Sequence, residues 1–428
     1  MKFPFWPDFT GYRNIDLGLS RVYQLLARLD NPQNKIPPTI HIAGTNGKGS
    51  TLAFLQQIFV ENGYLVHSYT SPHLVNFNER IILNGKEISD DFLNEILIEC
   101  KAAAEKSPLI PVTFFEGITV AAFLAFSRVK ADLLLLETGM GGRLDATNIL
   151  PEVLCSIITP IAFDHTDFLG KTLSKIAFEK SGIIKKNCPV IIAKQKVSAL
   201  KTIEKQAFAM KSKTKIFNRD FKIKKEKNGF LFEMSGKKIS FPSPSLVGDH
   251  QIENAATSIV AALTQKKFSL DEKKIKSALQ KTVWPCRLQK ITAGKFHEIL
   301  PNNFELYLDG SHNTQGATTI RKFLLQQKNK KVYVIFSMLK DKDCDGFLKK
   351  ISAQVDNLLA VKIADEPKSR TSQELCEIAK KNKINSATAQ NFDDAFKKVF
   401  TLDKSSKPAL VLICGSLYLA GNFLEENK

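Results

Sequence analysis

Among the residues that could do chemistry, the most informative form one run, Gly44-Thr45-Asn46-Gly47-Lys48-Gly49-Ser50. Glycines let the backbone wrap around a phosphate with its N–H groups, and a helix that starts there adds positive potential. Lys48 would hold the terminal phosphates, and Ser50 would place a hydroxyl beside a Mg²⁺ ion. Gly49 separates these two residues, so the run differs from the common G-x-x-x-x-G-K-[ST] loop. A tight turn with a coincidental lysine is the alternative, and the combination of features favours ATP binding.

Three further polar residues lie at the carboxyl ends of predicted strands: Ser71, Glu137 and His165. Because these ends form the ligand crevice of an open α/β sheet, the three side chains could converge beside Lys48. Oxygen ligands suit Mg²⁺, whereas histidine is a less usual partner. From the residues alone, Ser71 could be a turn residue and His165 a helix cap or a core histidine. The carboxylate of Glu137 ends a leucine run and needs a partner, because burying it unpaired is costly.

The hydrophobic pattern around these residues predicts a parallel sheet. Strand, glycine turn, helix and strand follow one another over residues 39–69, which is a βαβ unit. The predicted strands are 39–43, 65–69, 131–137, 155–159 and 189–193, and the predicted helices are 15–29, 50–61, 90–105, 116–128, 171–182 and 250–264. Residues 216–242 alternate in short runs with turn signals, and we interpret them as a small antiparallel meander.

A second α/β pattern begins at residue 305, after a segment with two prolines and no strong periodicity. Strands are predicted at 305–308, 331–336, 357–361 and 408–413, with helices at 315–326, 344–353, 371–380 and 391–399. We therefore predict an α/β protein with two domains. A P-loop parallel-sheet ATPase domain would span residues 1–295, and a smaller Rossmann-like α/β domain would span residues 296–428.

Composition limits the classes of function. Lys and Arg total 61 against 43 Asp and Glu, which gives a net charge of +18, and 51 of the 61 are lysines. Nucleic-acid surfaces favour arginine, so we interpret the lysines as a general surface bias and expect no nucleic-acid partner. The seven cysteines are widely spaced, as in reduced thiols of the cytoplasm. We find no apolar run long enough to span a membrane and no signal peptide, and we expect a cytoplasmic protein without a membrane partner.

The loop with its intervening glycine, G-T-x-G-K-G-[ST], resembles that of the folylpolyglutamate synthase/dihydrofolate synthase family in the Mur ligase superfamily. Further motifs similar to those of this family occur in order along nearly the whole chain. They are Tyr69-Thr70-Ser71-Pro72-His73-Leu74, Asn78-Glu79-Arg80-Ile81, the string from Glu137 to Asn148, Asp164-His165-Thr166-Asp167, Glu179-Lys180-Ser181-Gly182-Ile183, Asn254-Ala255-Ala256, Pro285-Cys286-Arg287 and Asp309-Gly310-Ser311-His312-Asn313. Cys286 stands where the family has a glycine. The resemblance is to the bifunctional bacterial type.

The resemblance implies a role for each motif at the nucleotide end. The residues expected to bind ATP are Thr45, Asn46, Gly47, Lys48, Gly49, Ser50, Asn254, Arg287 and Asp309. Ser71, Glu137 and His165 would bind magnesium, and two Mg²⁺ ions are expected. Lys180 would be carbamylated, as N6-carboxylysine, and would help to hold the second ion. Lys48, Lys180 and His312 would take part in catalysis, with His312 near the adenine or the acyl phosphate.

At the other end of the site, the resemblance implies a pteridine pocket lined by Ile15, Asp16, Leu17, Phe115, Leu144, Asp145 and Ala146. The implied reaction joins L-glutamate to dihydropteroate, and to the γ-carboxylate of reduced folates, through an acyl phosphate. A monomer with small-molecule partners is expected. The alternatives are an enzyme that only extends folate tails, a Mur-type cell-wall ligase and, from another class, a nucleic-acid-dependent P-loop ATPase.

Overall fold

The computed structural model describes residues 4–7, 17–403, 405 and 407–428. It contains two compact units, which we describe separately. The N-terminal unit runs to Ser245 and resumes over Gln251–Val283, and the C-terminal unit combines Leu246–His250 with Trp284–Lys428. The domain limit predicted between residues 295 and 296 stays a prediction.

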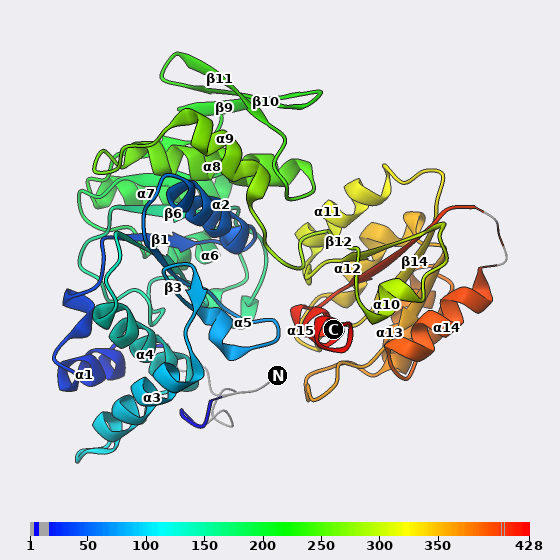
Figure 1. The fold of residues 1–428 in the computed structure, drawn as a ribbon, viewed down its shortest axis with the longest axis horizontal. Helices are drawn as coiled ribbons and strands as arrows, with labels where there is room; N and C mark the ends of the chain where they lie inside the picture. Colours follow the sequence, from blue (N-terminus) through cyan, green and yellow to red (C-terminus); the bar gives the residue numbers. More distant parts are fainter. Residues whose placement is uncertain (1–3, 8–16, 404, 406) are drawn as a thin grey trace. The chain divides into compact units, whose positions relative to one another are not determined.

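An eight-stranded sheet forms the centre of the N-terminal unit (Figure 1). In spatial order, its strands are β4 (Lys86–Glu87), β3 (Ile81–Leu83), β2 (Val66–Tyr69), β5 (Leu133–Glu137), β1 (Thr39–Ala43), β6 (Cys155–Ile158), β7 (Val190–Ile192) and β8 (Thr214–Ile216). The strands from β2 to β8 run parallel, whereas β3 and β4 join antiparallel. β1, β5 and β6 are buried along their whole length, as the unbroken apolar runs of a central parallel strand require.

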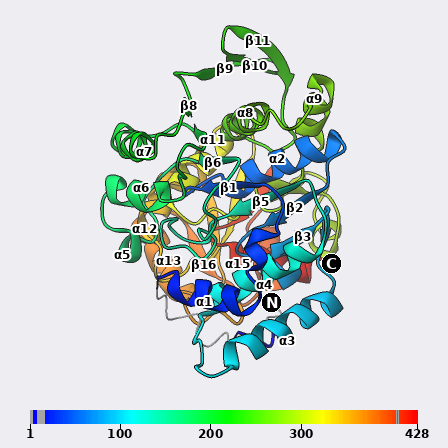
Figure 2. The same ribbon diagram turned by 90° about the vertical axis from the view of Figure 1, so that its left-hand side faces the viewer.

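Helices cover both faces of this sheet (Figure 2). One face carries α1 (Ser20–Arg28), α3 (Asp90–Glu105), α4 (Phe114–Arg128), α6 (Leu173–Ser181) and α7 (Val197–Ala209). The other face carries α2 (Lys48–Glu61), with α8 (Asp249–Thr264) and α9 (Glu272–Lys281) packed on it. Shorter helices are η2 (Pro32–Asn34), η3 (Phe77–Arg80) and α5 (Thr166–Leu169). This layering leaves the carboxyl ends of the strands to carry polar loops.

A three-stranded antiparallel sheet forms the predicted meander. It contains β9 (Phe221–Glu226), β10 (Gly229–Met234) and β11 (Lys237–Pro242), with β10 in the centre. Phe221, Phe230, Phe232 and Phe241 are buried, while the lysines of β9 are exposed, as in a sheet with one face covered. Ile216 lies in β8 at the edge of the large sheet, so the antiparallel meander begins at Phe221.

The C-terminal unit contains a six-stranded sheet with Rossmann-like parallel pairing. Its spatial order is β12 (Gln289–Ile291), β13 (Phe304–Leu308), β17 (Ala409–Cys414), β14 (Lys331–Phe336), β15 (Asn357–Ala360) and β16 (Ser386–Thr388), and β12 is antiparallel. α11 (Thr314–Leu324), α12 (Cys344–Ile351) and α13 (Ser372–Lys381) share one apolar core with the sheet. α10 (Lys295–Glu298), α14 (Phe392–Leu402) and α15 (Leu417–Glu426) pack together through Phe296, Phe392, Phe396 and Phe423, and η4 (Ser352–Gln354) follows α12.

The α/β class predicted from the sequence is confirmed, with a larger parallel-rich sheet followed by a smaller one. Elements that the pattern did not predict include the short strands β3, β4, β8, β12 and β16 and the helices α5, α7, α9, α10 and α15. Within the described residues, no helix is both long enough and apolar enough to span a membrane.

Candidate functional site

The glycine run forms the connection between β1 and α2. β1 ends at Ala43 and α2 begins at Lys48, so the run leads into the N-terminus of a helix of 14 residues. The N–H groups of a first helical turn have no acceptor within the helix and are available to an anion. The N–H groups of Thr45 and Asn46 both donate to the carbonyl oxygen of Pro160, which anchors the loop to the segment after β6.

Asn254 of α8 packs against this loop. A Cβ atom at Gly47, which has φ +83°, would lie 2.7 Å from the Oδ1 atom of Asn254. The Asn254 amide donates to Gln251 Oε1 at 3.0 Å, and Gln251 Nε2 donates to Ser50 Oγ at 3.3 Å. Gln251, which the sequence analysis missed, therefore links two residues of the predicted nucleotide site. Its position three residues before Asn254 on one helix was the available signal.

Replacing Gly47 with alanine should weaken ATP binding. A left-handed backbone costs a non-glycine residue about 1–2 kcal/mol, and the new methyl group would displace Asn254. We expect KM for ATP to rise about tenfold or more, since about 1.4 kcal/mol corresponds to tenfold. Gly63→Ala is the matched control, because Gly63 has φ +92° and open space around a Cβ atom. An unchanged KM for ATP in Gly47→Ala would contradict the assignment of the loop.

Lys48 and Glu137 form an ion pair at the carboxyl edge of the large sheet. The distance between Lys48 Nζ and Glu137 Oε1 is 3.6 Å, and the side chains are only 15% and 6% exposed. Glu137 is the last residue of β5 and lies beside Ile42 of β1. The structure therefore holds a cation and a carboxylate together at the start of α2, where a phosphate and its metal ion would bind.

The predicted metal ligands follow three parallel strands of one sheet, and β1 lies between two of them, β5 and β6. Ser71 comes just after β2, Glu137 ends β5 and His165 lies in the segment after β6. His165 precedes α5 with φ +48°, and its Nε2 atom is 3.9 Å from Asp164 Oδ2. Among the residues that the structure describes, no group of three or more His, Cys, Asp or Glu side chains is arranged to hold a metal ion. The convergence of Ser71, Glu137 and His165 on one ion stays a prediction.

Lys180 is a buried lysine beside the loop. Its Nζ atom donates to the carbonyl oxygen of Gly44 at 2.7 Å, and the residue is 4% exposed. Burial, and next the positive charge of Lys48, lower the pKa of Lys180 to about 7, while the carboxylates of Asp164, Asp145 and Glu137 oppose that shift. An amine with a pKa near neutrality is partly uncharged, and the uncharged form is a nucleophile.

The glycine-rich segment after β5 folds around Asp145. Its buried carboxylate accepts hydrogen bonds from the N–H of Met140 and from both the N–H and the hydroxyl of Thr147. Because the Thr147 hydroxyl gives its proton to Asp145, His41 Nε2 donates to the same hydroxyl oxygen, at 2.9 Å. Burial raises the pKa of Asp145, and these hydrogen bonds oppose the rise. Asp145 therefore stabilises the segment from within, and its predicted contact with substrate stays a prediction.

Phe115 lies against the same segment from α4. A Cβ atom at Gly139 would be 2.3 Å from Cζ of Phe115, so the ring rests on the backbone of that glycine. Of the other residues predicted for the pteridine end, Leu17 and Leu144 are half-buried and Ala146 is buried. Ile15 and Asp16 lie outside the described residues.

Asp309 organises a second group of predicted residues, in the C-terminal unit. It directly follows β13 and is buried. Its Oδ2 atom accepts the N–H of Leu288 at 2.9 Å, and its Oδ1 atom accepts the N–H of Ser311 at 2.8 Å. Both carboxylate oxygens thus fix backbone segments that precede and follow the strand.

Arg287 and His312 lie on those two backbone segments. The Arg287 guanidinium and the Gly310 N–H both donate to the carbonyl oxygen of Cys286 at 2.9 Å, and His312 Nδ1 is 3.0 Å from the Gly310 carbonyl oxygen. Cys286 has φ +58°, a conformation that glycine adopts more readily. Arg287, Asp309 and His312 are therefore gathered around Gly310, whereas Asn254 and Lys48 belong to the N-terminal unit.

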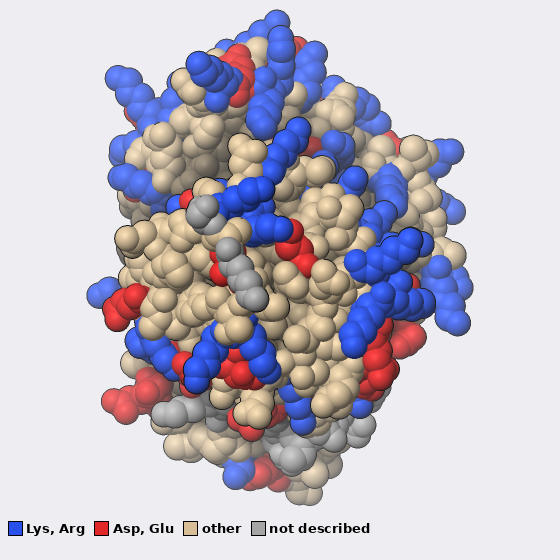
Figure 3. Space-filling model, turned by 90° about the vertical axis from the view of Figure 1, so that its right-hand side faces the viewer, with Lys and Arg blue, Asp and Glu red and all other residues tan. Residues whose placement is uncertain are grey.

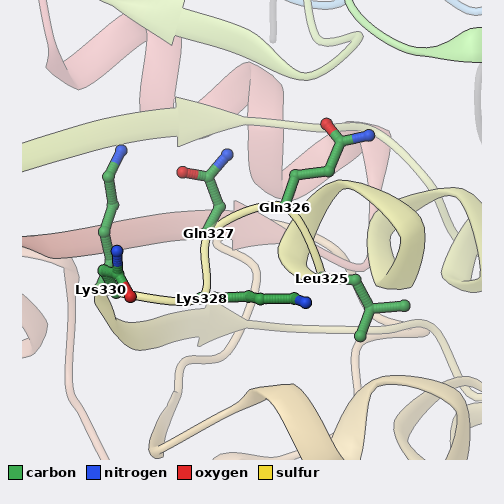
Figure 4. Close-up of a pocket in the computed structure, with 6 residues that line it drawn as sticks. Leu325, Gln326, Gln327, Lys328 and Lys330 are labelled. Atoms are coloured by element: carbon green, nitrogen blue, oxygen red, sulfur yellow. The ribbon is translucent and has the colours of Figure 1, made fainter.

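Surface features outside these two groups add no further predicted residue to the site. On the face shown in Figure 3, Lys and Arg side chains are spread widely, with Asp and Glu between them. Figure 4 shows a hollow of the C-terminal unit lined by six consecutive residues, Leu325–Lys330, between α11 and β14. A single turn of chain lines this hollow, and it contains none of the predicted site residues.

Comparison with known proteins matches both halves of the chain. The Mur ligase middle domain matches residues 42–262, and the C-terminal domain of dihydrofolate synthetase matches residues 291–426. The chain is 34% identical over 426 residues to the dihydrofolate synthase/folylpolyglutamate synthase of Bacillus subtilis (strain 168), covering 96% of this chain and 95% of that relative. It is 30% identical over 416 residues to the Escherichia coli (strain K12) protein of the same name, covering 96% and 92%.

Solved structures agree with these matches. The structure of E. coli FolC in complex with DHPP and ADP has a TM-score of 0.86 at 29% identity, covering 96% of this chain and 94% of that one. A bifunctional folylpolyglutamate synthase/dihydrofolate synthase from Yersinia pestis, complexed with AMPPNP and a Mn ion, has a TM-score of 0.84 at 28% identity, with the same coverage of 96% and 94%. The likeness therefore extends over both sheets and both groups of predicted site residues.

Proposed function

The chain belongs to the dihydrofolate synthase/folylpolyglutamate synthase family of Mur ligases and is an ATP-dependent ligase, and on that premise we propose that it joins L-glutamate to dihydropteroate and to the γ-carboxylate of reduced folates. One observation carries the proposal. The Lys48–Glu137 pair lies at the N-terminus of α2, and buried Lys180 donates to the same loop. This arrangement concentrates the charges that a phosphoryl transfer between two anions needs.

The proposed reaction has two steps. The substrate carboxylate attacks the γ-phosphorus of ATP, which forms an acyl phosphate and releases ADP. The amine of glutamate then attacks the carbonyl carbon, phosphate leaves and the nitrogen loses a proton. Because the reactants of the first step are both anions, the protein must neutralise their charge and align them. Lys48 would supply the positive charge at the γ-phosphate, and the first turn of α2 would supply N–H donors.

Ser71, Glu137 and His165 are the residues that we propose to hold magnesium. A hydroxyl, a carboxylate and an imidazole make up a donor set that fits Mg²⁺ when phosphate oxygens and water complete it. The ion would neutralise phosphate charge. The buried position of Glu137 beside Lys48 supports this assignment, because both groups face the start of α2.

Carbamylation of Lys180 is a proposal that its environment supports. The uncharged amine would attack CO₂ and lose a proton, which gives a carbamate and turns a cation into an anionic oxygen ligand. The Lys180 pKa of about 7 makes the uncharged amine available near neutral pH. A mass increase of one CO₂ on the peptide that contains Lys180, measured on the intact protein without acid, would verify it.

The remaining assignments follow the two groups of residues described above. We propose that the loop from Thr45 to Ser50, Asn254, Arg287 and Asp309 bind ATP, and that His312 acts beside the adenine or the acyl phosphate. Leu17, Phe115, Leu144, Asp145 and Ala146 would line the pteridine site, together with Ile15 and Asp16. The Phe115 ring on Gly139 supports a flat apolar wall for a pteridine. We also propose a monomer with small-molecule partners. The seven cysteines, none of which forms a disulfide, favour the cytoplasm.

The first test measures ADP release by purified protein with ATP, Mg²⁺ and L-glutamate, with dihydropteroate and tetrahydrofolate supplied in separate reactions. Lys48→Ala serves as the blank. We expect turnover with both pteridines. Turnover with tetrahydrofolate alone would reduce the proposal to a tail-extending enzyme. Turnover with neither, while ATP still binds, would contradict it and would leave a cell-wall ligase or a nucleic-acid-dependent ATPase, and the latter would show salt-sensitive stimulation by nucleic acid.

A further inference from the structure

Arg80 is a buried guanidinium with no carboxylate partner in the described part of the chain. The residue is 3% exposed, and no Asp or Glu oxygen there lies within ion-pair distance of it. Its Nε atom donates to His73 Nδ1 at 2.8 Å. A guanidinium has five N–H donors, of which this bond uses one, and the Arg80 side chain also hydrogen-bonds Tyr69. Burying a charge without a counter-ion is expensive, and such a charge calls for an explanation.

The acid next to Arg80 in the sequence is turned away from it. Both oxygens of Glu79 accept backbone N–H groups, from Leu74 at 2.7 Å and from Val75 and Asn76 at 2.9 and 2.7 Å. This capping box starts η3 and fixes the loop that carries Arg80. Glu79 therefore stabilises the loop and does not compensate the guanidinium.

Two aromatic rings lie beside Arg80. Its guanidinium carbon lies 5.6 Å from the ring centre of Phe77 and 5.8 Å from that of Phe114. Among the described residues, this cation therefore lies beside aromatic rings and has no carboxylate partner.

The position of Arg80 connects it with the proposed pteridine site. Phe114 precedes Phe115, the residue whose ring rests on Gly139 of the glycine-rich segment. The Tyr69 hydroxyl bonds to Thr119 Oγ1, one turn along α4, and Thr119 Oγ1 donates to the Phe115 carbonyl oxygen. The backbone of Arg80 is fixed as well, because its carbonyl oxygen accepts the N–H of the residue that follows β2.

We propose, on the basis of the function proposed above, that Arg80 binds a carboxylate group of the pteridine-linked substrate. A planar guanidinium matches a carboxylate with two parallel hydrogen bonds, and the neighbouring rings suit the aromatic part of such a molecule. Phosphate of ATP is assigned to the loop at Lys48, which leaves the substrate carboxylate as the anion for Arg80. Buried Arg80 would position the substrate carboxylate, and the free-energy cost of burying its charge would be offset when the substrate binds.

The test replaces Arg80 with methionine, which keeps an unbranched side chain and removes the charge. In the ligand-free protein we expect Tm to stay the same or rise, because an uncompensated buried charge is lost. The Kd and the KM for dihydropteroate should rise about 10–100-fold, which is the usual loss of affinity when hydrogen bonds to a charged group are removed. KM for ATP should stay within about twofold. Arg80→Lys keeps the charge but not the planar, two-pronged donor group, and its Kd for dihydropteroate should lie between those of wild type and Arg80→Met.

Arg128→Met is the matched control, since Arg128 pairs with Glu95 and Glu99 on the surface of the same unit. Arg80→Gln replaces Arg80→Met if the latter fails to fold, because glutamine keeps a donor for His73 without the charge. An Arg80 variant with lower Tm and unchanged Kd for dihydropteroate would overturn the inference. If KM for ATP changed instead, Arg80 would serve the nucleotide and the inference would be wrong.

Failure of the inference and failure of the proposed function give different results. Wild-type turnover with an unaffected Arg80 variant would overturn the inference alone. If the wild-type protein turned over no pteridine, the proposed function would be wrong. A separate test of carboxylate binding by Arg80 then measures Tm with and without p-aminobenzoate. This carboxylate should raise the Tm of wild type and leave that of Arg80→Met unchanged.

Discussion

Replacing Lys48 with methionine is expected to lower kcat for ADP release about a thousandfold or more. Removal of one donor aimed at developing charge typically costs 10²–10³ in rate, and Lys48 is in addition the cation assigned to the transferred phosphoryl group. The side chain is only 15% exposed, so methionine should occupy its place and preserve the fold. The measurement compares kcat and Tm of the variant and the wild type at saturating ATP, glutamate and pteridine.

Lys222→Met controls for the loss of a lysine. Lys222 lies on β9 of the meander and is 60% exposed, so we expect it to leave kcat unchanged. A Lys48→Met protein that is folded and retains more than about a tenth of wild-type kcat would exclude Lys48 from phosphoryl transfer, since one decade equals about 1.4 kcal/mol.

Replacing Lys180 with methionine should have the second largest effect, with opposite consequences for activity and stability. We expect kcat to fall about 10²–10³-fold, because the variant cannot form the carbamate that would help to hold the second ion. The free energy of unfolding of the ligand-free protein near pH 7 should rise. The lowered pKa of Lys180 means that burying its charged form is unfavourable, and methionine removes that cost.

The pH dependence of stability identifies the cause. The pKa of Lys180 is about 7 when folded and 10.5 when unperturbed, so between these values the unfolded state binds one more proton than the folded state. In CO₂-free buffer, the free energy of unfolding should therefore rise with pH by up to about 1.4 kcal/mol per unit in this window. Below pH 7 the charged amine is buried and the penalty is complete. Urea titrations across pH 6–10 should show this contribution in wild type and its loss in Lys180→Met.

Lys175, an exposed lysine of the same helix, provides the control. In Lys175→Met the free energy of unfolding should rise with pH as steeply as in wild type. A Lys180→Met protein with full kcat would rule out the proposed carbamate. Lys48 connects the two predictions, because its positive charge contributes to the low pKa of Lys180. In Lys48→Met the rise of stability with pH should therefore begin at a higher pH.

The central strands and the phosphate loop were predictable from the residues alone because both signals are local. β1, β5 and β6 are continuous apolar runs, and a strand covered on both faces needs them. The short strands β3, β4 and β16 contain two or three residues each, and they form because longer neighbours offer pairing partners. No pattern within such a short segment identifies it.

The hydrogen bonds inside the site were less predictable, because each buried polar group has several potential partners in the folded chain. The predicted contact of Asp145 with substrate stays a prediction, and its carboxylate also accepts hydrogen bonds from Met140 and Thr147, which the sequence did not indicate. Adjacent opposite charges in the sequence suggest a pair between Glu79 and Arg80, but Glu79 binds backbone N–H groups instead, and no other carboxylate of the described residues pairs with Arg80. Such choices are decided by competition between partners in the folded chain.

Transfer of oxygen from substrate to phosphate tests the central claim most directly. Dihydropteroate labelled with ¹⁸O in its carboxylate is incubated with the protein, ATP, Mg²⁺ and L-glutamate, and the mass of the released phosphate is determined. An acyl phosphate transfers one carboxylate oxygen to phosphorus, so we predict one ¹⁸O atom in inorganic phosphate for each amide formed. Unlabelled phosphate with normal amide yield, or label in AMP, would contradict γ-phosphoryl transfer to the substrate carboxylate.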